Sequence, residues 1–326
     1  MVEPLVVDNE DILLESNDNQ SRRMLEAARH AAASDAIVLL NGESGSGKSV
    51  LARQIHRWSR RAQFPFLTVN CAMLPENQLE NELFGQMYGG STGTVSDKPG
   101  RLKAADGGTV FLEEISNMAA AVQAKFLRFV EEQTFECVGG EQAIRLHLRI
   151  IVASSRDLAA EVAAHRFRED LYYRLSVITL QVPALHERTG DILRLATQML
   201  SVAAARYNRP ELRFSPDASF ALVHHRWPGN LRELRNVVER AAVLCPGEVI
   251  SAECLPDVLH RSQSQSLAAV LTSARLDDVE REHIIRVMAA SRTLEDAANR
   301  LGINLSTLWR RRKRYGLDSI AIASKQ

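Results

Sequence analysis

Short apolar runs alternate with amphipathic segments along the first part of the chain. Each run has the length of a buried strand, and the segments between them have the apolar spacing of helices. Strands that alternate with helices predict a parallel sheet covered on both faces, which is the doubly wound α/β class. The runs are AIVLL (36–40), FLTVN (66–70), TVFL (109–112), LRIIVAS (148–154) and VITLQV (177–182).

Strand signals stop after Pro183, and the spacing of apolar positions becomes helical. The turn Trp227-Pro228-Gly229-Asn230 separates two helical stretches, DILRLATQMLSVAAARY and LRELRNVVERAAVL, which predict a small helical domain. The polar stretch HRSQSQS (260–266) is typical of a linker before a last helical unit. We therefore expect an N-terminal extension (1–19), an α/β domain (20–182), a helical domain (183–259), a linker (260–275) and a terminal helical unit (276–318).

The composition is that of an ordinary globular protein, with 45% apolar and 25% charged residues among 326. No apolar run approaches the roughly 20 residues that span a membrane. The acidic start MVEPLVVDNE lacks the features of a secretory signal, so we expect a cytoplasmic protein with no membrane partner. The cysteines Cys71, Cys137, Cys245 and Cys254 form no C-x-x-C pair, which favours reduced thiols over a zinc site.

A glycine-rich loop follows the first expected strand and precedes the helical pattern VLARQIHRW. It matches G-x-x-x-x-G-K-S, the phosphate-binding loop, in the strand-loop-helix order that this loop requires. Its backbone N–H groups surround phosphates, while Lys48 is expected to reach the β- and γ-phosphates and Ser49 to coordinate Mg²⁺. The expected nucleotide-binding residues are Gly42, Glu43, Ser44, Gly45, Ser46, Gly47, Lys48 and Ser49.

An acidic pair ends the strand TVFL, where a neighbour of the loop strand is expected to present carboxylates to the phosphates. Glu114 is the candidate base that activates water, and Glu113 is the candidate magnesium partner. An exposed acidic strand end is the alternative interpretation. The phosphate-binding loop in the same domain favours the catalytic one.

Basic residues gather at the end of the chain, because residues 291–318 hold six Arg and one Lys against three acids. This stripe on a chain of zero formal charge predicts a module for a polyanion. The apolar stripe of residues 276–290 suits either dimer packing or a domain core. It is made by Leu276, Val279, Ile284, Val287 and Met288.

Two further helices follow this stripe, with Thr293-Leu294-Glu295-Asp296 as a capping box, a turn at Leu301-Gly302, and Asn304 as the next cap. This pattern predicts a helix-turn-helix that binds double-stranded DNA, with Leu308 and Tyr315 facing inward. The expected base readers are Ser306, Thr307, Arg310 and Arg311, and the expected phosphate contacts are Arg312, Lys313 and Arg314. A solvated basic helix is the alternative.

The chain resembles sigma-54-dependent enhancer-binding proteins over nearly its whole length, with a Fis-type DNA-binding end. The resemblance implies an AAA+ domain, a helical lid, ATP between the subunits of a hexameric ring, and the sigma-54 RNA polymerase holoenzyme as partner. It implies arginines in trans at Arg168 and Arg174, a sensor at Arg232, and Asn70 as the restraint on the catalytic glutamate. The segments that carry it are NCAMLPENQLENELFG (70–85), GRLKAADGGTVFLEE (100–114), FREDLYYRL (167–175) and WPGNLREL (227–234).

The sequence departs from this family in the loop that contacts sigma-54. Where the family has GAFTGA, this chain has GGSTGT, so that Ser91 replaces the aromatic and Thr92 is kept. Glu113 also stands where the family has Asp, and Ser155 stands where it has a sensor Asn. We further expect no N-terminal receiver domain, because only about 20 residues precede the ATPase segment.

These observations predict a DNA-bound ATPase that remodels promoter-bound polymerase from a ring. The altered loop leaves two alternatives open. One is a DNA-binding regulator, either a repressor or a sigma-54-independent activator. The other is a subunit of a mixed ring with a paralogous partner whose loops contact sigma-54.

Overall fold

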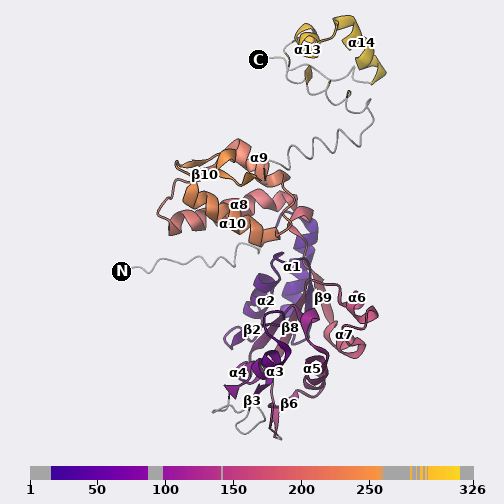
Figure 1. Cartoon of the computed structure of the whole chain (residues 1–326), viewed down its shortest axis with the longest axis vertical. Coiled ribbons are helices and arrows are strands. Elements are labelled where there is room, and N and C mark those ends of the chain that lie inside the picture. Colours follow the sequence, from indigo (N-terminus) through magenta and orange to yellow (C-terminus); the bar gives the residue numbers. More distant parts are fainter. Residues whose placement is uncertain are drawn as a thin grey trace. The chain divides into compact units, whose positions relative to one another are not determined.

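The computed structural model describes residues 16–86, 98–140, 142–257 and 293–315, together with residues 259, 280, 284, 287, 288 and 291. The chain forms two compact units, Met1–Pro256 and Asp257–Gln326 (Figure 1). No helix among the described residues is long and apolar enough to cross a membrane.

A five-stranded parallel sheet forms the centre of the α/β part of the first unit (Figure 1). Its strand order is β2-β5-β8-β1-β9. All five expected strands are present, and the crossovers between them carry helices, so the predicted α/β class is confirmed. Because the strands are parallel, their carboxyl ends lie at one edge of the sheet. The strands are β1 (Val38–Asn41), β2 (Phe66–Asn70), β5 (Thr109–Glu113), β8 (Arg149–Ser154) and β9 (Ile178–Gln181).

Helices cover both faces of this sheet, and the side chains of each strand alternate between two apolar cores. Val38 and Leu40 pack with α1 and α2, whereas Leu39 packs on the opposite face, where Phe126 and Leu171 contribute from α5 and α7. The helices are α1 (Asn19–Ala32), α2 (Lys48–Arg57), α3 (Glu76–Phe84), α4 (Arg101–Ala104), α5 (Ala120–Glu132), α6 (Leu158–Ala163) and α7 (Glu169–Leu175).

Short elements lie at the periphery of this α/β part. Two antiparallel pairs are formed by β3 (Gly85–Gln86) with β4 (Lys98–Pro99), and by β6 (Thr134–Glu136) with β7 (Ala143–Arg145). A 3-10 turn, η2 (Ile115–Asn117), follows the acidic end of β5.

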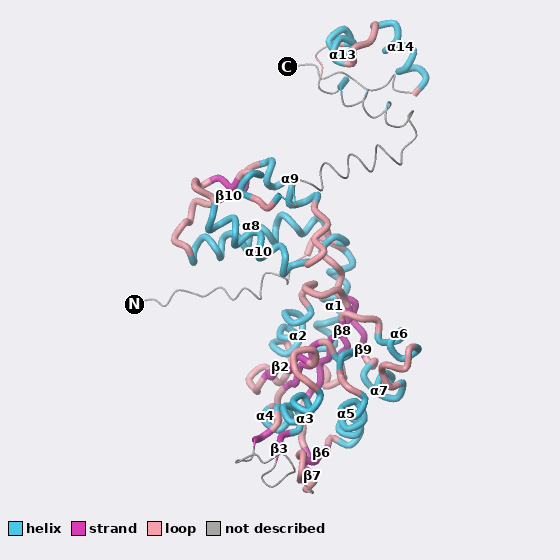
Figure 2. Tube along the Cα trace, viewed as in Figure 1, coloured by secondary structure: helices cyan, strands magenta, loops and turns pink. Residues whose placement is uncertain are grey.

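The helical part of the first unit is built on α8 (Thr189–Arg206), α9 (Pro216–His224) and α10 (Asn230–Leu244) (Figure 2). Its one departure from the expected all-helical content is a two-residue parallel pair, β10 (Arg213–Phe214) with β11 (Val249–Ile250), too short to carry an alternating pattern. Two 3-10 turns, η3 (Leu185–Glu187) and η4 (Ala252–Cys254), complete it.

The second unit contains α13 (Leu294–Arg300) and α14 (Leu305–Arg314). The hydroxyl of Thr293 accepts the N–H of Asp296 at 3.1 Å, so Thr293 caps α13 as expected. Three residues of the apolar stripe before these helices belong to the core of this unit, since Ile284 and Met288 are buried with Leu308 and Val287 packs against them. Leu276 and Val279 lie outside the described residues.

Candidate nucleotide-binding site and DNA-facing helix

The phosphate-binding loop joins β1 to α2 and adopts backbone conformations that only glycine tolerates well. Gly45 and Gly47 have φ values of +77° and +112°. A Cβ on Gly45 would lie 2.5 Å from the carbonyl oxygen of Gly229, which immediately precedes α10. The loop therefore requires glycine for conformation and for this close approach, and it leads straight into the positive end of α2.

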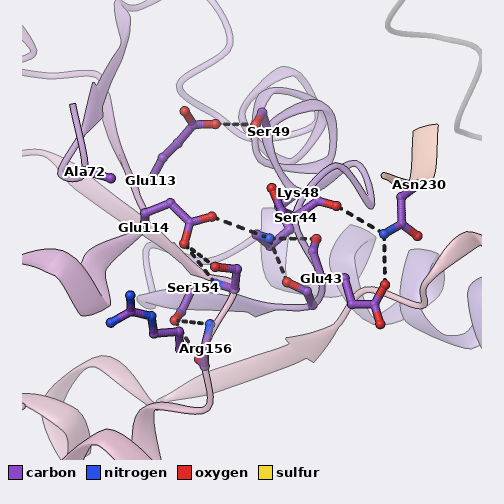
Figure 3. Close-up of polar contacts among 12 residues, drawn as sticks. Glu43, Ser44, Lys48, Ser49, Ala72, Glu113, Glu114, Ser154, Arg156 and Asn230 are labelled. Carbon is purple, nitrogen blue, oxygen red and sulfur yellow. Dashed lines mark hydrogen bonds and ion pairs between the residues drawn. The ribbon is translucent and has the colours of Figure 1, made fainter. Parts of the chain in front are cut away.

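Lys48 is 8% exposed, and its ammonium lies inside the loop. It donates to the carbonyls of Gly42 at 2.7 Å and Glu43 at 3.0 Å, and it stands 3.9 Å from a carboxylate oxygen of Glu114 (Figure 3). Burial lowers the pKa of the Lys48 ammonium, and the charges of Glu114 and Glu113 oppose that shift. The two carboxylates thus favour the charged ammonium at the place where phosphates would arrive.

Glu113, at the end of β5, accepts a hydrogen bond from the hydroxyl of Ser49 (Figure 3). The amide of Asn70, the register partner of Glu113 on β2, donates to its other oxygen at 3.3 Å. Two adjacent hard oxygens, a hydroxyl and a carboxylate, fit Mg²⁺, which takes few protein ligands and completes its shell with phosphates and water. No cluster of three or more His, Cys, Asp or Glu able to hold a metal occurs among the described residues.

Glu114 has a left-handed backbone conformation with φ of 52°, which turns its side chain away from that of Glu113. Its Oε2 accepts hydrogen bonds from the Ser155 hydroxyl at 2.5 Å and the Ser155 N–H at 3.1 Å. Ser155, and not Asn70, therefore holds this carboxylate in the structure. The Asn70 amide contacts Glu113, and the restraint that the family resemblance implied for Asn70 stays a prediction.

The loop is braced by two residues that sequence analysis did not select. Asn230 is fully buried, and its amide donates to Glu43 Oε2 at 2.9 Å and to the Ser44 carbonyl at 3.1 Å (Figure 3). Its oxygen accepts the N–H of Leu185 at 2.7 Å. Arg188, also buried, donates to the Ser46 carbonyl at 2.8 Å. The one sequence feature at Asn230 is the WPGN turn, which predicts a turn residue and gives no indication that its side chain contacts the loop.

A cavity of 630 Å³ lies between the loop, the strand ends and α10. Arg232 reaches it from α10 and donates to the hydroxyl of Ser44 at 3.1 Å, so the expected sensor is next to the loop. Arg235 and Asn236, which sequence analysis missed, line the same wall from the next turn of α10. The other residues in its lining include Lys48, Ser49, Asn70, Glu113, Glu114 and Ser155.

Arg168 and Arg174 do not line this cavity. Arg168 forms an exposed ion pair with Asp170, at 2.6 Å, which raises the pKa of the guanidinium. Arg174 is exposed on α7. Both side chains are thus available on the surface. Ser91 and Thr92, the expected sigma-54 contacts, lie outside the described residues.

The exposed face of α14 differs from the expected set of DNA contacts. Ser306, Arg310, Lys313 and Arg314 are exposed and Thr307 is half-buried. By contrast, Arg312 is only 9% exposed, and Arg311 forms an ion pair with Glu280. Sequence analysis missed Trp309, which is 55% exposed among the exposed basic residues.

The acidic pair ends β5, which β8 separates from the loop strand β1, so the expectation that it ends a neighbouring strand was wrong. A parallel sheet with a phosphate-binding loop after one strand, an acidic pair at the same edge and a helical lid beside the loop defines the P-loop NTPase fold of the AAA+ class. The sequence matches the Sigma-54 interaction domain over residues 14–181 and the AAA+ ATPase lid domain over residues 186–271. It also matches the bacterial regulatory protein, Fis family, over residues 275–315.

Relatives and solved structures agree with these matches. The chain is 47% identical to the alginate biosynthesis transcriptional regulatory protein AlgB of Pseudomonas aeruginosa, over 93% of this chain and 68% of AlgB. It is 42% identical to the response regulator protein PilR of the same organism, over 88% of this chain and 66% of PilR. The crystal structure of NtrX from Brucella abortus in complex with ADP superposes with a TM-score of 0.72 at 34% identity, covering 94% of this chain and 70% of NtrX.

This chain therefore belongs to the family of sigma-54-dependent enhancer-binding transcriptional regulators. It spans about two thirds of the length of AlgB and PilR.

Proposed function

We propose that the chain hydrolyses ATP as a subunit of an oligomeric ring, binds an enhancer-like DNA site and remodels the sigma-54 RNA polymerase holoenzyme at a promoter. The observation that carries the proposal is the convergence of Lys48, Glu114 and Arg232 on one cavity beside the phosphate-binding loop. A cation, a carboxylate and a lid arginine around one phosphate position are what phosphoryl transfer requires.

Each group around the cavity has its own role in phosphoryl transfer. Lys48 exchanges its bonds to loop carbonyls for bonds to the β- and γ-phosphates, while Glu114 leaves Ser155 and orients the attacking water as its base. Ser49 and Glu113 would hold Mg²⁺, which would neutralise charge on the phosphate oxygens. Arg232 couples the γ-phosphate to α10, so that the lid responds to hydrolysis.

Arg168 and Arg174 act in trans in the same proposal. Their exposure outside the cavity of their own subunit is what an arginine donated to a neighbouring subunit needs. The ion pair between Arg168 and Asp170 is exposed and so costs little to break. Such a ring would act in the cytoplasm, where its DNA and polymerase partners are found.

For DNA contact we propose the exposed face of α14, namely Ser306, Thr307, Arg310, Lys313 and Arg314, and we add Trp309. The aromatic ring of Trp309 can contact the methyl group of thymine in the major groove. Arg311 and Arg312 stabilise the fold of the second unit instead, because the first pairs with Glu280 and the second is buried.

We expect Arg310→Ala to weaken binding to a duplex selected from a random library by about 1–3 kcal/mol, because a base-edge contact is lost. Arg312→Ala is the matched control on the same helix. It is expected to lower the stability of the second unit while leaving the affinity of the folded protein close to wild type. Fluorescence anisotropy at fixed salt, with thermal unfolding alongside, measures both. The reverse ranking of affinities would show that the assignment of the two arginines is wrong.

A second candidate function is favoured by one observation, the serine at position 91 in the loop GGSTGT. Loss of an aromatic from a contact loop removes apolar surface of the kind that dominates binding energy. The chain would then be a DNA-binding regulator without remodelling activity, or a subunit that depends on a paralogous partner for the sigma-54 contact.

Open-complex formation on an enhancer-bearing sigma-54 promoter tests the proposed function. Purified protein is combined with core polymerase, sigma-54, ATP and Mg²⁺, and DNA melting is followed together with phosphate release. We expect melting that is lost in Lys48→Ala. If the wild-type protein alone hydrolyses ATP without melting DNA, the second candidate is supported. The variant S91F, which introduces the aromatic residue of the family, should then give melting if the loop is the cause.

A further inference from the structure

Two of the four cysteines lie side by side in the lid, although they are nine residues apart in the sequence. Cys245 immediately follows α10, Cys254 ends η4, and their sulfur atoms are 3.3 Å apart. A bend at residues 246–248 and the strand β11 (Val249–Ile250) separate them along the chain. A disulfide bond is about 2.05 Å long, so the two sulfurs need to approach each other by little more than an ångström.

The two thiols differ in exposure and acidity. Cys245 is 3% exposed, its sulfur contacts the carbonyl of Val249 at 3.3 Å, and burial raises its pKa. Cys254 is half-buried, and a hydrogen bond with the hydroxyl of Ser251 lowers its pKa. An accessible, more acidic thiol beside a buried one is the arrangement of an attacking and a resolving cysteine.

The charged groups around the pair are Arg209 and Glu253. The guanidinium of Arg209 donates to the carbonyls of Ala242 at 2.7 Å and Gly247 at 2.6 Å, and its charge favours the thiolate at Cys245. The carboxylate of Glu253 disfavours the thiolate at Cys254, but less than Ser251 favours it.

We propose that Cys245 and Cys254 form a reversible disulfide when the protein meets a peroxide. The Cys254 thiolate attacks one oxygen of hydrogen peroxide, the O–O bond breaks, and the leaving hydroxide takes a proton to become water. The resulting sulfenic acid is then attacked by the sulfur of Cys245, which loses its proton, and a second water leaves. Two thiols and one peroxide thus give one disulfide and two waters, with two electrons passing from sulfur to oxygen.

The pair lies between the helix that contacts the phosphate-binding loop and the start of the second unit. Cys245 ends the helix whose first turns hold Asn230 and Arg232 against the phosphate-binding loop. Cys254 lies three residues before Asp257, where the second unit begins. The disulfide closes residues 245–254 into a ring, and so fixes the end of α10 to the segment that leads toward the DNA-binding helices.

The disulfide can be detected in one tryptic peptide. Trypsin releases residues 241–261 with both cysteines, whereas Cys71 and Cys137 fall in the separate peptides 62–101 and 129–145. The folded full-length protein is treated with hydrogen peroxide, alkylated with iodoacetamide, digested and analysed by mass spectrometry. We expect peptide 241–261 to lose two hydrogens and to escape alkylation, while the other two peptides stay fully alkylated. Dithiothreitol should restore alkylation of peptide 241–261.

Variants identify the order of events. Cys245→Ser should leave a sulfenic acid on Cys254, which dimedone traps. Cys254→Ser should leave peptide 241–261 unoxidised. Cys137→Ser is the matched control and should behave like the wild type. Cys71 should stay reduced, because burial raises its pKa to about 12. Any of three results with the wild-type protein would overturn the proposal. These are disulfides between subunits, oxidation of Cys71 or Cys137 before the pair, and a sulfinic acid on Cys254 with no cross-link.

Discussion

Replacing Arg174 or Arg168 by Ala is expected to lower ATP turnover about 10³-fold or more, because an arginine supplied in trans stabilises the charge of the transferring phosphoryl group. ATP binding by the isolated subunit should be unchanged, since neither side chain lines its own cavity. Phosphate release measures the first quantity, and equilibrium binding of a fluorescent ATP analogue measures the second.

Arg166 provides the matched control for this prediction. It lies two residues from Arg168, and its exposed guanidinium pairs with the buried carboxylate of Glu161 at 2.7 Å. Arg166→Ala removes a surface charge of the same kind from the same segment. Because Arg166 does not line the nucleotide cavity, the substitution should leave turnover within a few-fold of wild type.

Mixing two inactive proteins separates an arginine in trans from one that acts within its own subunit. Arg174→Ala retains its own Glu114, and Glu114→Gln retains its arginines. In a randomly mixed ring, roughly a quarter of the sites have an intact Glu114 and an intact neighbouring arginine, so activity should return to about that fraction. A mixture that stays inactive, although the subunits exchange, would show that the arginine does not act between subunits.

The fold of the α/β part could be predicted from sequence because its signals are local. Each strand is a short apolar run, and each loop between strands is followed by helical spacing, so the order of elements determines a parallel sheet. The phosphate-binding loop and the acidic pair were recognisable for the same reason. Each occupies a few consecutive positions directly after a strand.

The contacts that complete the site could not be predicted in this way. Asn230 bonds to Glu43 across 187 positions, and Ser155 bonds to Glu114 across 41. Such pairs arise from the order in which strands and lid are packed, and no spacing rule relates them. The nearness of Cys245 to Cys254 also depends on a two-residue strand that has no sequence signature.

In α14, the spacing of residues along the helix already indicates which arginine is buried. Leu308 was expected to face inward, and Arg312 follows it by four positions, which is one turn of helix. Helical spacing therefore places Arg312 on the buried face, where it is found, and Arg311 at its border. The helical spacing within the basic run of α14 thus distinguishes a buried arginine from the exposed ones.

Glu114→Gln is expected to abolish most ATP hydrolysis, by about 10²–10⁴-fold, while ATP binding is retained. The amide has nearly the shape of the carboxylate and can still bond to Ser155, but it cannot accept a proton from water. The protein should therefore remain in its ATP-bound state. Phosphate release after a single addition of ATP, together with the amount of nucleotide that remains bound after gel filtration, measures both effects.

Two further substitutions distinguish the base from its neighbours. Glu113→Gln should instead raise the Mg²⁺ concentration needed for half-maximal turnover, because Glu113 contacts Ser49, the other proposed Mg²⁺ ligand. Lys48→Ala should abolish binding itself. If Glu114→Gln still released phosphate at a rate near wild type while Glu113→Gln did not, the two acids would have exchanged roles. The left-handed turn at Glu114 argues against that outcome, because it directs only this carboxylate toward Ser155 and Lys48.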